Sequence, residues 1–323
     1  MGGDSADAPL VIVGPTASGK SSLALEFARR ARDGACASSS TELVSVDSMA
    51  VYRGMDVGTA KPTAAERSEV RHHLIDFVDP AERFTVVDYA EAFASAMADI
   101  AERRAIPLLV GGTGLYLRAV VDGLTPPPEF PDIAAELDSE ARAHPEGIAA
   151  LHRRLAQLDP LAASRMEPTN ARRVVRALSV CLGAGRAFSS YGPGLRTYPD
   201  VPFRMLGIDV DLQTLDQRIA DRCRRQLENG FLDEVRQLTA RPLSRTAAQA
   251  LGYKELRAHL DGSCTLEEAT DVIVRRTRRF ARRQRRWFAR DPRITWIAHG
   301  HPAAMADRVQ QLCCSKPATS GST

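Results

Sequence analysis

The sequence predicts an α/β protein in which a parallel sheet is flanked by helices and carries an all-helical insertion. Three observations support this fold class. Short apolar runs alternate with helical patterns in the first third of the chain, which is typical of sheets built from strand–helix–strand units. Residues 11–22, VIVGPTASGKSS, place a glycine-rich loop directly after an apolar run. From residue 133 to about residue 188, the chain is rich in Ala, Leu and Arg and has almost no strand pattern.

The glycine-rich segment matches the spacing of a phosphate-binding loop. Gly14 is followed by four residues and then by Gly19, Lys20 and Ser21, as in G-x-x-x-x-G-K-[ST]. The amides of such a loop and the following helix N-terminus bind anionic oxygens, the lysine adds a cation, and the serine can hold a magnesium ion. The alternative is a glycine turn before an ordinary helix, but the flanking strand and amphipathic helix favour phosphate binding. The core is therefore predicted to be P-loop NTPase-like.

Buried parallel strands are expected at residues 10–13, 42–47 and 106–112, where short apolar runs end in Gly or a polar residue. A helix is expected at residues 85–103, between two of these runs. A later apolar run at residues 204–210 is expected to rejoin the sheet. Parallel pairing follows because helices separate the strands along the chain.

The domain boundaries follow from a change in composition at GLTPPPEFPD, where three consecutive prolines cannot continue a helix and indicate a hinge. The P-loop-like catalytic core, with basic helices near its C-terminal end, is predicted to comprise residues 9–124 and 199–300. The helical insertion is predicted at residues 125–198. The polar end of the chain, residues 301–323, is expected to be disordered.

Bulk composition narrows the class of protein. The 323 residues carry a net charge of only +3, so any affinity for nucleic acid must come from local clusters. The first ten residues lack the basic and apolar regions of a signal peptide, and no apolar run approaches the roughly 20 residues that span a bilayer. The six cysteines show no C-x-x-C pair, which is typical of reduced thiols. We expect a cytoplasmic monomer that does not associate with membranes.

Asp47 is the candidate catalytic acid. An NTP hydrolase needs a second acidic site, usually at the end of a later strand. Here the run at residues 106–112 leads into Gly111, Gly112 and Thr113, and only the run at residues 42–47 ends in an acid. Asp47 at a strand end facing the phosphate loop suits proton abstraction or metal binding. The alternative is a cap on the following turn. We favour catalysis.

Two helices carry arginine rows. Residues 211–230 have a regular apolar stripe, a capping residue in Asp211 and a stop at Asn229–Gly230. Arg218, Arg222 and Arg225 share another face of this helix, which is either solvated surface or a phosphate-binding face.

The second row lies on residues 272–290. At about 100° per residue, Ile273, Phe280 and Trp287 fall on one side of this helix, and a cationic row falls opposite. Because the apolar stripe is needed for packing, nucleic acid is a better partner for the row than a membrane surface. Gln284 is the polar misfit within the stripe. The row consists of Arg275, Arg279, Arg282 and Arg286.

Taken together, the motifs resemble those of the tRNA dimethylallyltransferase family, also called tRNA isopentenyltransferases. The resemblance covers roughly residues 9 to 297, and the motifs occur in the family's order. They are GPTASGKS, VDSMAVYRGMDVGTAKP, HHLIDFVDP, LLVGGTGLY, RRVVRAL, QALGYKEL and TRRFARRQRRWF.

The resemblance implies a reaction. The phosphate loop would hold the diphosphate of dimethylallyl diphosphate, and the acceptor would be N6 of the adenosine at position 37 of tRNA, next to the anticodon. That base would be flipped into a channel, and the insertion would clasp the anticodon stem-loop. Asp47 would be the general base on N6, with Thr16 and Arg218 completing the catalytic set.

The resemblance also implies binding residues. Mg²⁺ would be the cofactor, held at Ser21. The residues implied for diphosphate binding are Gly14, Pro15, Thr16, Ala17, Ser18, Gly19, Lys20 and Ser21. The residues implied for tRNA binding are Asp47, Ser48, Met49, Ala50, Thr113, Arg172, Arg173, Val174, Val175, Arg176, Gln249, Gly252, Tyr253 and Lys254, together with the arginine row of residues 272–290.

Two positions depart from the family pattern. Ala50 stands where the family usually has Gln, and Ala134 or a neighbour stands where an Arg is common. Each departure removes one expected contact to tRNA and leaves the catalytic set intact. Two other functions remain as alternatives: a nucleotide or small-molecule kinase, whose loop would hold ATP, and a nucleotide-gated RNA-binding protein without catalysis.

Overall fold

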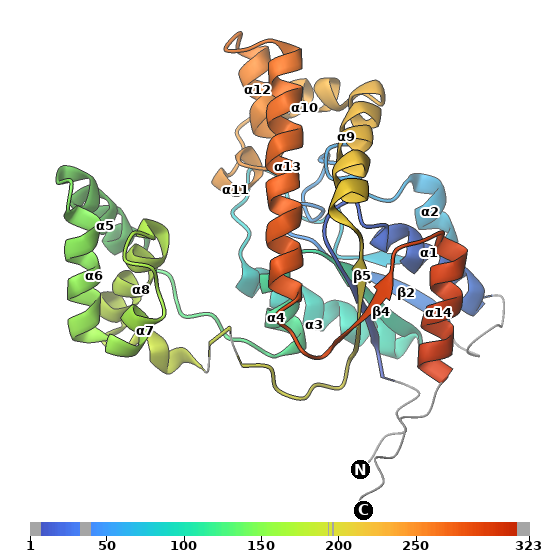
Figure 1. Cartoon of the computed structure of the whole chain (residues 1–323), viewed down its shortest axis with the longest axis horizontal. Coiled ribbons are helices and arrows are strands. Elements are labelled where there is room, and N and C mark those ends of the chain that lie inside the picture. Colours follow the sequence, from blue (N-terminus) through green and yellow to red (C-terminus); the bar gives the residue numbers. More distant parts are fainter. Residues whose placement is uncertain (1–7, 33–39, 193, 196, 315–323) are drawn as a thin grey trace, which may run out of the picture. The chain divides into compact units, whose positions relative to one another are not determined.

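The computed structural model describes residues 8–32, 40–192, 194–195 and 197–314 (Figure 1). The chain divides into two compact units. One unit comprises residues 1–121 and 200–323, and the other comprises residues 122–199.

The first unit is built on a six-stranded sheet in which every pairing is parallel, with strand order β3-β2-β4-β1-β5-β6. The predicted α/β fold with a parallel sheet is thus confirmed. The sequence did not predict β3, which has only two residues, or β6, in which only Ile294 and Ile297 are buried. The strands are β1 Leu10–Val13, β2 Thr41–Val46, β3 His72–His73, β4 Ile106–Gly111, β5 Arg204–Asp209 and β6 Ile294–Ala298.

Both faces of the sheet are covered, which explains why its central strands are apolar throughout. Val11 and Val13 point to one face, where helices α3 and α4 contribute to the core. Leu10 and Ile12 point to the other face, against α1 and α14. The helices of this unit are α1 Lys20–Arg32, α2 Ala64–Glu69, α3 Val86–Glu102, α4 Gly114–Val121, α9 Leu212–Glu228, α10 Phe231–Thr239, α11 Arg245–Ala248, α12 Tyr253–Leu260, α13 Leu266–Phe288 and α14 Pro302–Cys314.

Strand register brings three loops to one edge of the sheet. Val13 at the end of β1 is level with Gly111 of β4, and Gly111 is also level with Val46 of β2. The residues that follow these strands, including Asp47, therefore emerge side by side. Carboxyl edges of parallel sheets are where open α/β proteins bind ligands.

Local signals set the helix ends. Thr85 caps α3 by accepting from the amides of Val87 and Asp88. Asp211 caps α9 by accepting from the Thr214 amide at 2.8 Å, as its place in the sequence predicted. Figure 1 shows α13 as a long helix that packs beside α9 and α12.

The end of the chain corrects one prediction. Residues 301–323 were expected to be disordered, but residues 302–314 form α14, which packs on α1. Met305, Ala306 and Val309 are buried, because their spacing of one, three and four residues gives α14 an apolar face. The polar composition of the last residues hid this pattern. Residues 315–323 lie outside the described residues.

The second unit is helical. Its core includes Leu151, Leu155, Val174 and Leu178, each 0% exposed. Its helices are α5 Pro131–Ala143, α6 Gly147–Leu158, α7 Pro160–Ser164 and α8 Ala171–Ala184, followed by a 3₁₀ turn at Phe188–Tyr191.

Candidate active site

The phosphate loop connects β1 to α1 and has the backbone shape that its glycines allow. Gly19 has φ +92°, a left-handed conformation that a side chain would strain. The Lys20 ammonium donates to the Pro15 carbonyl at 2.8 Å. Burial lowers the pKa of Lys20 to about 8, although the nearby Asp47 carboxylate opposes this shift. Ser18 is fully buried, and its hydroxyl has no hydrogen-bond partner within the protein.

Two arginines of α9 reach this loop. Arg218 Nε donates to the Ala17 carbonyl at 2.7 Å, and Arg222 Nη1 donates to Thr16 Oγ1 at 3.2 Å. Arg225, the third member of the row, is exposed. Arg218 and Arg222 therefore face the phosphate loop, whereas Arg225 faces solvent. Arg222 was not among the predicted site residues, and its four-residue spacing from Arg218 was the signal that could have included it.

Asp47 follows β2 and is half-buried. One carboxylate oxygen, Oδ1, accepts from the amides of Met49 at 2.8 Å and Ala50 at 3.3 Å. The turn-capping alternative is thus part of what Asp47 does. The carboxylate also lies close enough to Lys20 to influence its pKa, so it stands beside the phosphate loop as well. Capping by one oxygen leaves the other for chemistry.

Thr113 joins the loop after β4 to the loop after β2. Its Oγ1 accepts from the Ser48 amide at 3.1 Å, and its own amide donates to the Val46 carbonyl at 3.3 Å. A side chain on Gly111 would collide with the Val46 backbone, so this close approach requires glycine. The turn therefore holds the Asp47 loop in place.

Gln284 of α13 reaches the same place from the other end of the chain. Its Oε1 accepts from the Thr16 amide at 2.8 Å, and its Nε2 donates to the Gly112 carbonyl at 2.8 Å. The sequence marked Gln284 as a polar misfit in an apolar stripe. The partners that explain it were not predictable from local pattern.

Glu234 of α10 is a further residue that the sequence reasoning missed. Its carboxylate accepts from three consecutive amides, those of Asp56, Val57 and Gly58, at 2.8, 2.7 and 3.0 Å. It also accepts from the Tyr253 hydroxyl at 2.6 Å. The loop that follows Met55 is therefore anchored to α10 and α12.

The residues predicted to bind tRNA divide by exposure. Val174, Val175 and Tyr253 are buried at 0%, 5% and 3% exposure, and Ala50 is buried as well. These side chains pack in the cores, and the contact of their segments with tRNA stays a prediction. Gly252 is buried too. The exposed members are Arg172, Arg173, Gln249, Lys254, Arg275, Arg279 and Arg286.

Two predicted arginines hold protein groups. Arg176 donates to the carbonyls of Pro127 and Pro128 at 2.6 and 3.0 Å, which anchors the proline-rich segment to α8. Arg282 forms a bidentate pair with Asp216 of α9 at 2.7 and 3.0 Å. The Arg282 guanidinium is therefore held by α9, although its side chain remains 39% exposed.

The residues at the phosphate loop offer few ligands for a metal ion. The described residues hold no group of three His, Cys, Asp or Glu side chains suited to a metal centre. Ser21 is exposed at the start of α1. Mg²⁺ keeps several waters and commonly binds one or two protein groups plus substrate phosphates. A magnesium ion here fits Ser21 together with phosphate oxygens and water.

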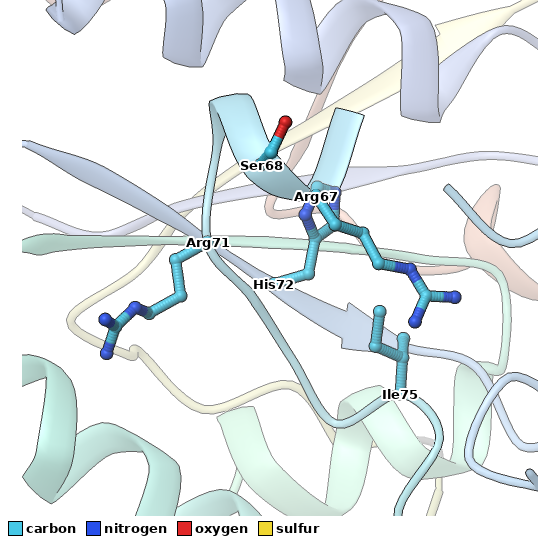
Figure 2. Close-up of a pocket in the computed structure, with 5 residues that line it drawn as sticks. All are labelled: Arg67, Ser68, Arg71, His72 and Ile75. Atoms are coloured by element: carbon cyan, nitrogen blue, oxygen red, sulfur yellow. The ribbon is translucent and has the colours of Figure 1, made fainter. Parts of the chain in front are cut away.

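A surface cavity is lined by residues from the segment around β3, the outermost strand next to β2. Its volume is about 430 Å³, and it lies beside β3 (Figure 2). Figure 2 shows the Arg67 and Arg71 side chains pointing in different directions. Arg67 is already paired with Asp76. The other lining residues are Ser68, His72 and Ile75. None of them belongs to the predicted site, so we do not assign this cavity to the reaction.

No helix within the described part of the chain combines the length and apolarity needed to cross a bilayer.

Fold and site together define a P-loop-like α/β protein in which the Asp47 carboxylate stands beside the loop between β1 and α1. The sequence model of the IPP transferase family matches residues 50–291. The chain belongs to this family, as the motifs indicated.

Known relatives resemble the chain over almost its whole length. A tRNA dimethylallyltransferase of Geobacter metallireducens is 45% identical over 295 residues, covering 90% of this chain and 92% of that protein. One from Streptomyces coelicolor is 44% identical over 303 residues, covering 93% and 92%.

Solved structures show the same fold. The tRNA isopentenylpyrophosphate transferase of Bacillus halodurans has a TM-score of 0.66 and 37% identity, covering 95% of both chains. A eukaryotic dimethylallyltransferase acting on tRNA has a TM-score of 0.74 and 25% identity, covering 94% of this chain and 77% of the other.

Proposed function

We propose that this protein is a tRNA dimethylallyltransferase, which transfers a dimethylallyl group from dimethylallyl diphosphate to an adenosine of tRNA. Family membership supports this activity. The structural observation that carries the proposal is the juxtaposition of the phosphate loop with Asp47, the carboxylate that follows β2. The acceptor atom we propose is N6 of adenosine 37, next to the anticodon, and the products are N6-(dimethylallyl)adenosine and diphosphate.

The chemistry assigns roles to the residues at the sheet edge. N6 of adenine is a poor nucleophile, so Asp47 takes its proton as the bond from N6 to the allylic C1 forms. The bond between C1 and the diphosphate oxygen breaks, and the negative charge leaves with diphosphate. Lys20 and Arg218 stand beside the loop to stabilise that charge. Thr16 completes the catalytic set, with its hydroxyl held by Arg222.

We further propose Mg²⁺ as the cofactor. When bound, it would neutralise charge on the diphosphate and so ease its departure. We propose Ser21, in the first turn of α1, as the protein group that would hold it. The phosphate loop supplies the other contacts to the diphosphate through its amides and Lys20.

We propose that tRNA binds through exposed arginines. Arg275, Arg279 and Arg286 are exposed on α13. Arginine forks suit phosphate oxygens. Exposed Arg172 and Arg173 in the helical unit are proposed to contact the anticodon stem-loop. The target base must leave its stack to reach a closed site, as in other enzymes that modify bases.

The kinase alternative is not favoured. A kinase of this fold would need a second acidic group near its metal, but β4 runs into Gly112 and Thr113, and Asp209 at the end of β5 is paired with Arg285 at 3.0 Å. A pure RNA-binding protein would have no use for a carboxylate beside the phosphate loop.

The test is mass spectrometry of tRNA incubated with the protein, Mg²⁺ and dimethylallyl diphosphate. We expect a mass gain of one dimethylallyl group on adenosine 37. A parallel competition experiment measures binding of labelled dimethylallyl diphosphate against ATP. Unmodified tRNA, with ATP displacing the label at equal concentration, would overturn the proposal in favour of the kinase.

A further inference from the structure

Gln284 is a buried amide in a helix that otherwise contributes apolar groups and arginines to its surroundings. Its exposure is 8%. Both ends of the amide are satisfied, since Oε1 accepts from the Thr16 amide and Nε2 donates to the Gly112 carbonyl, each at 2.8 Å. A backbone donor and a backbone acceptor at these places leave one orientation for the amide.

The turn that Gln284 contacts is shaped to receive α13. A side chain on Gly112 would collide with the Gln284 amide, and a side chain on Gly114 would collide with the Trp287 indole. Two glycines thus let α13 lie directly on the turn between β4 and α4. The contact is specific, because Gln284 and Trp287 lie three residues apart on one face of α13.

The two backbone groups that Gln284 bridges serve different parts of the site. One lies in the loop that would bind the donor, and the other lies in the turn that supports the candidate general base. Thr16 lies in the phosphate loop, which holds the donor under the proposed function. Gly112 precedes Thr113, which fixes the Ser48 amide at 3.1 Å and so positions the loop that carries Asp47. Gln284 therefore links the phosphate loop to the turn after β4, and through Thr113 to the loop that carries Asp47.

We propose that Gln284 is a positioning residue that sets the spacing between the diphosphate-binding loop and the turn that supports the general base. The proposal rests on the proposed transferase function. Gln284 touches neither substrate in this role. Its effect is on the approach of N6 to the allylic carbon, and a misplacement of about 1 Å can lower a reaction rate about 10²-fold.

Two variants separate positioning from folding. Gln284→Met keeps the length of the side chain and loses both hydrogen bonds. Gln284→Glu keeps the acceptor for Thr16 but turns a second acceptor toward the Gly112 carbonyl. A protonated carboxyl has one donor and one acceptor, like the amide, so the Gln284→Glu variant should regain function when the carboxyl takes up a proton. Gln213→Met, at an exposed position of α9, is the matched control.

The experiment measures single-turnover transfer to tRNA, with separate dissociation constants for dimethylallyl diphosphate and tRNA. For Gln284→Met we expect a rate about 10²-fold below wild type, with both dissociation constants within about threefold. For Gln284→Glu we expect the rate relative to wild type to rise as pH falls. Gln213→Met should behave as wild type.

Two outcomes would overturn the inference. One is a wild-type single-turnover rate in the Gln284→Met variant. The other is a Gln284→Glu rate that stays in constant ratio to wild type at every pH while both folded proteins bind their substrates normally. Failure of the wild-type protein to modify tRNA would instead count against the proposed function, so the two failures are distinguishable.

Discussion

Asp47 Oδ1 and the Met49 amide nitrogen lie 2.8 Å apart, so the candidate general base also caps the turn that follows it. Capping and proton abstraction can be separated by substitution. An amide keeps an acceptor oxygen for the cap but cannot take the proton from N6.

We therefore expect Asp47→Asn to retain the fold and both substrates while transfer slows by about 10²–10⁴-fold. Asp47→Ala should in addition lower the melting temperature, since it leaves the Met49 amide without its acceptor. Single-turnover kinetics and thermal unfolding provide the measurements. A near-normal rate in the Asp47→Asn variant would reduce Asp47 to a turn cap.

Lys20 predicts a pH dependence for donor binding. Burial lowers its pKa to about 8, so the free protein loses this cation as pH rises through that value. The dissociation constant of dimethylallyl diphosphate should be flat below about pH 8 and then rise by up to about tenfold per pH unit. Phosphate groups complete their ionisation near pH 6, so the ligand does not cause this change. Calorimetry across pH measures it.

Lys20→Arg is the control for that profile, because the guanidinium remains charged over the whole range. Its affinity is expected to be lower but independent of pH. A rise above pH 8 that persists in the Lys20→Arg variant would assign the titration to another group.

Arg218 and Arg225 test which part of the α9 row faces the diphosphate. Arg218 donates to the Ala17 carbonyl of the phosphate loop, whereas Arg225 is exposed. We expect Arg218→Gln to lower kcat by about 10²–10³-fold, as loss of a charge-stabilising donor does elsewhere. Arg225→Gln should retain the wild-type kcat. Equal losses in the two variants would point to a general effect of helix charge.

The arginines of α13 predict a salt-dependent interaction with tRNA. Arg275 and Arg279 are exposed, and each phosphate that they neutralise releases a counterion. Changing both to Gln should flatten the log–log dependence of affinity on salt by about one to two units. The affinity for tRNA should fall equally for tRNAs with and without the target adenosine.

Arg282→Gln is the matched control on the same helix, because Arg282 is paired with Asp216. Exposed or half-exposed pairs contribute about 0–1 kcal/mol, so its loss should slightly lower stability and leave the salt slope unchanged. If the salt dependence of tRNA affinity is unchanged when Arg275 and Arg279 are both Gln, the tRNA contact would instead be assigned to the exposed arginines of the helical unit.

The packing of α14 predicts that truncating one of its buried side chains lowers the stability of the protein. Met305 is 3% exposed and belongs to the core between α14 and the sheet. Met305→Ala should destabilise the protein by about 2–5 kcal/mol, which denaturant unfolding would detect. Arg308 is exposed on the same helix, and Arg308→Ala should change stability by no more than about 0.5 kcal/mol. Equal stability of the two variants would mean that α14 is not part of the folded core in solution.

The sequence by itself determined the features that depend on neighbouring residues. The phosphate loop is contiguous, so its spacing was readable, and the apolar runs predicted β1, β2, β4 and β5. Asp211 predicted the start of α9 because a cap acts on amides only two or three residues away. The arginine row of α13 was also visible, because helical periodicity assigns residues to faces.

Only the tertiary structure decided which of these faces meet other parts of the chain. Arg282 pairs with Asp216, and Arg222 donates a hydrogen bond to Thr16. Gln284 forms hydrogen bonds with both Thr16 and Gly112. The physical reason is that a helical pattern fixes the direction of a side chain relative to its own axis and says nothing about what lies there. Partners more than 60 residues away along the chain are set by strand order and helix packing.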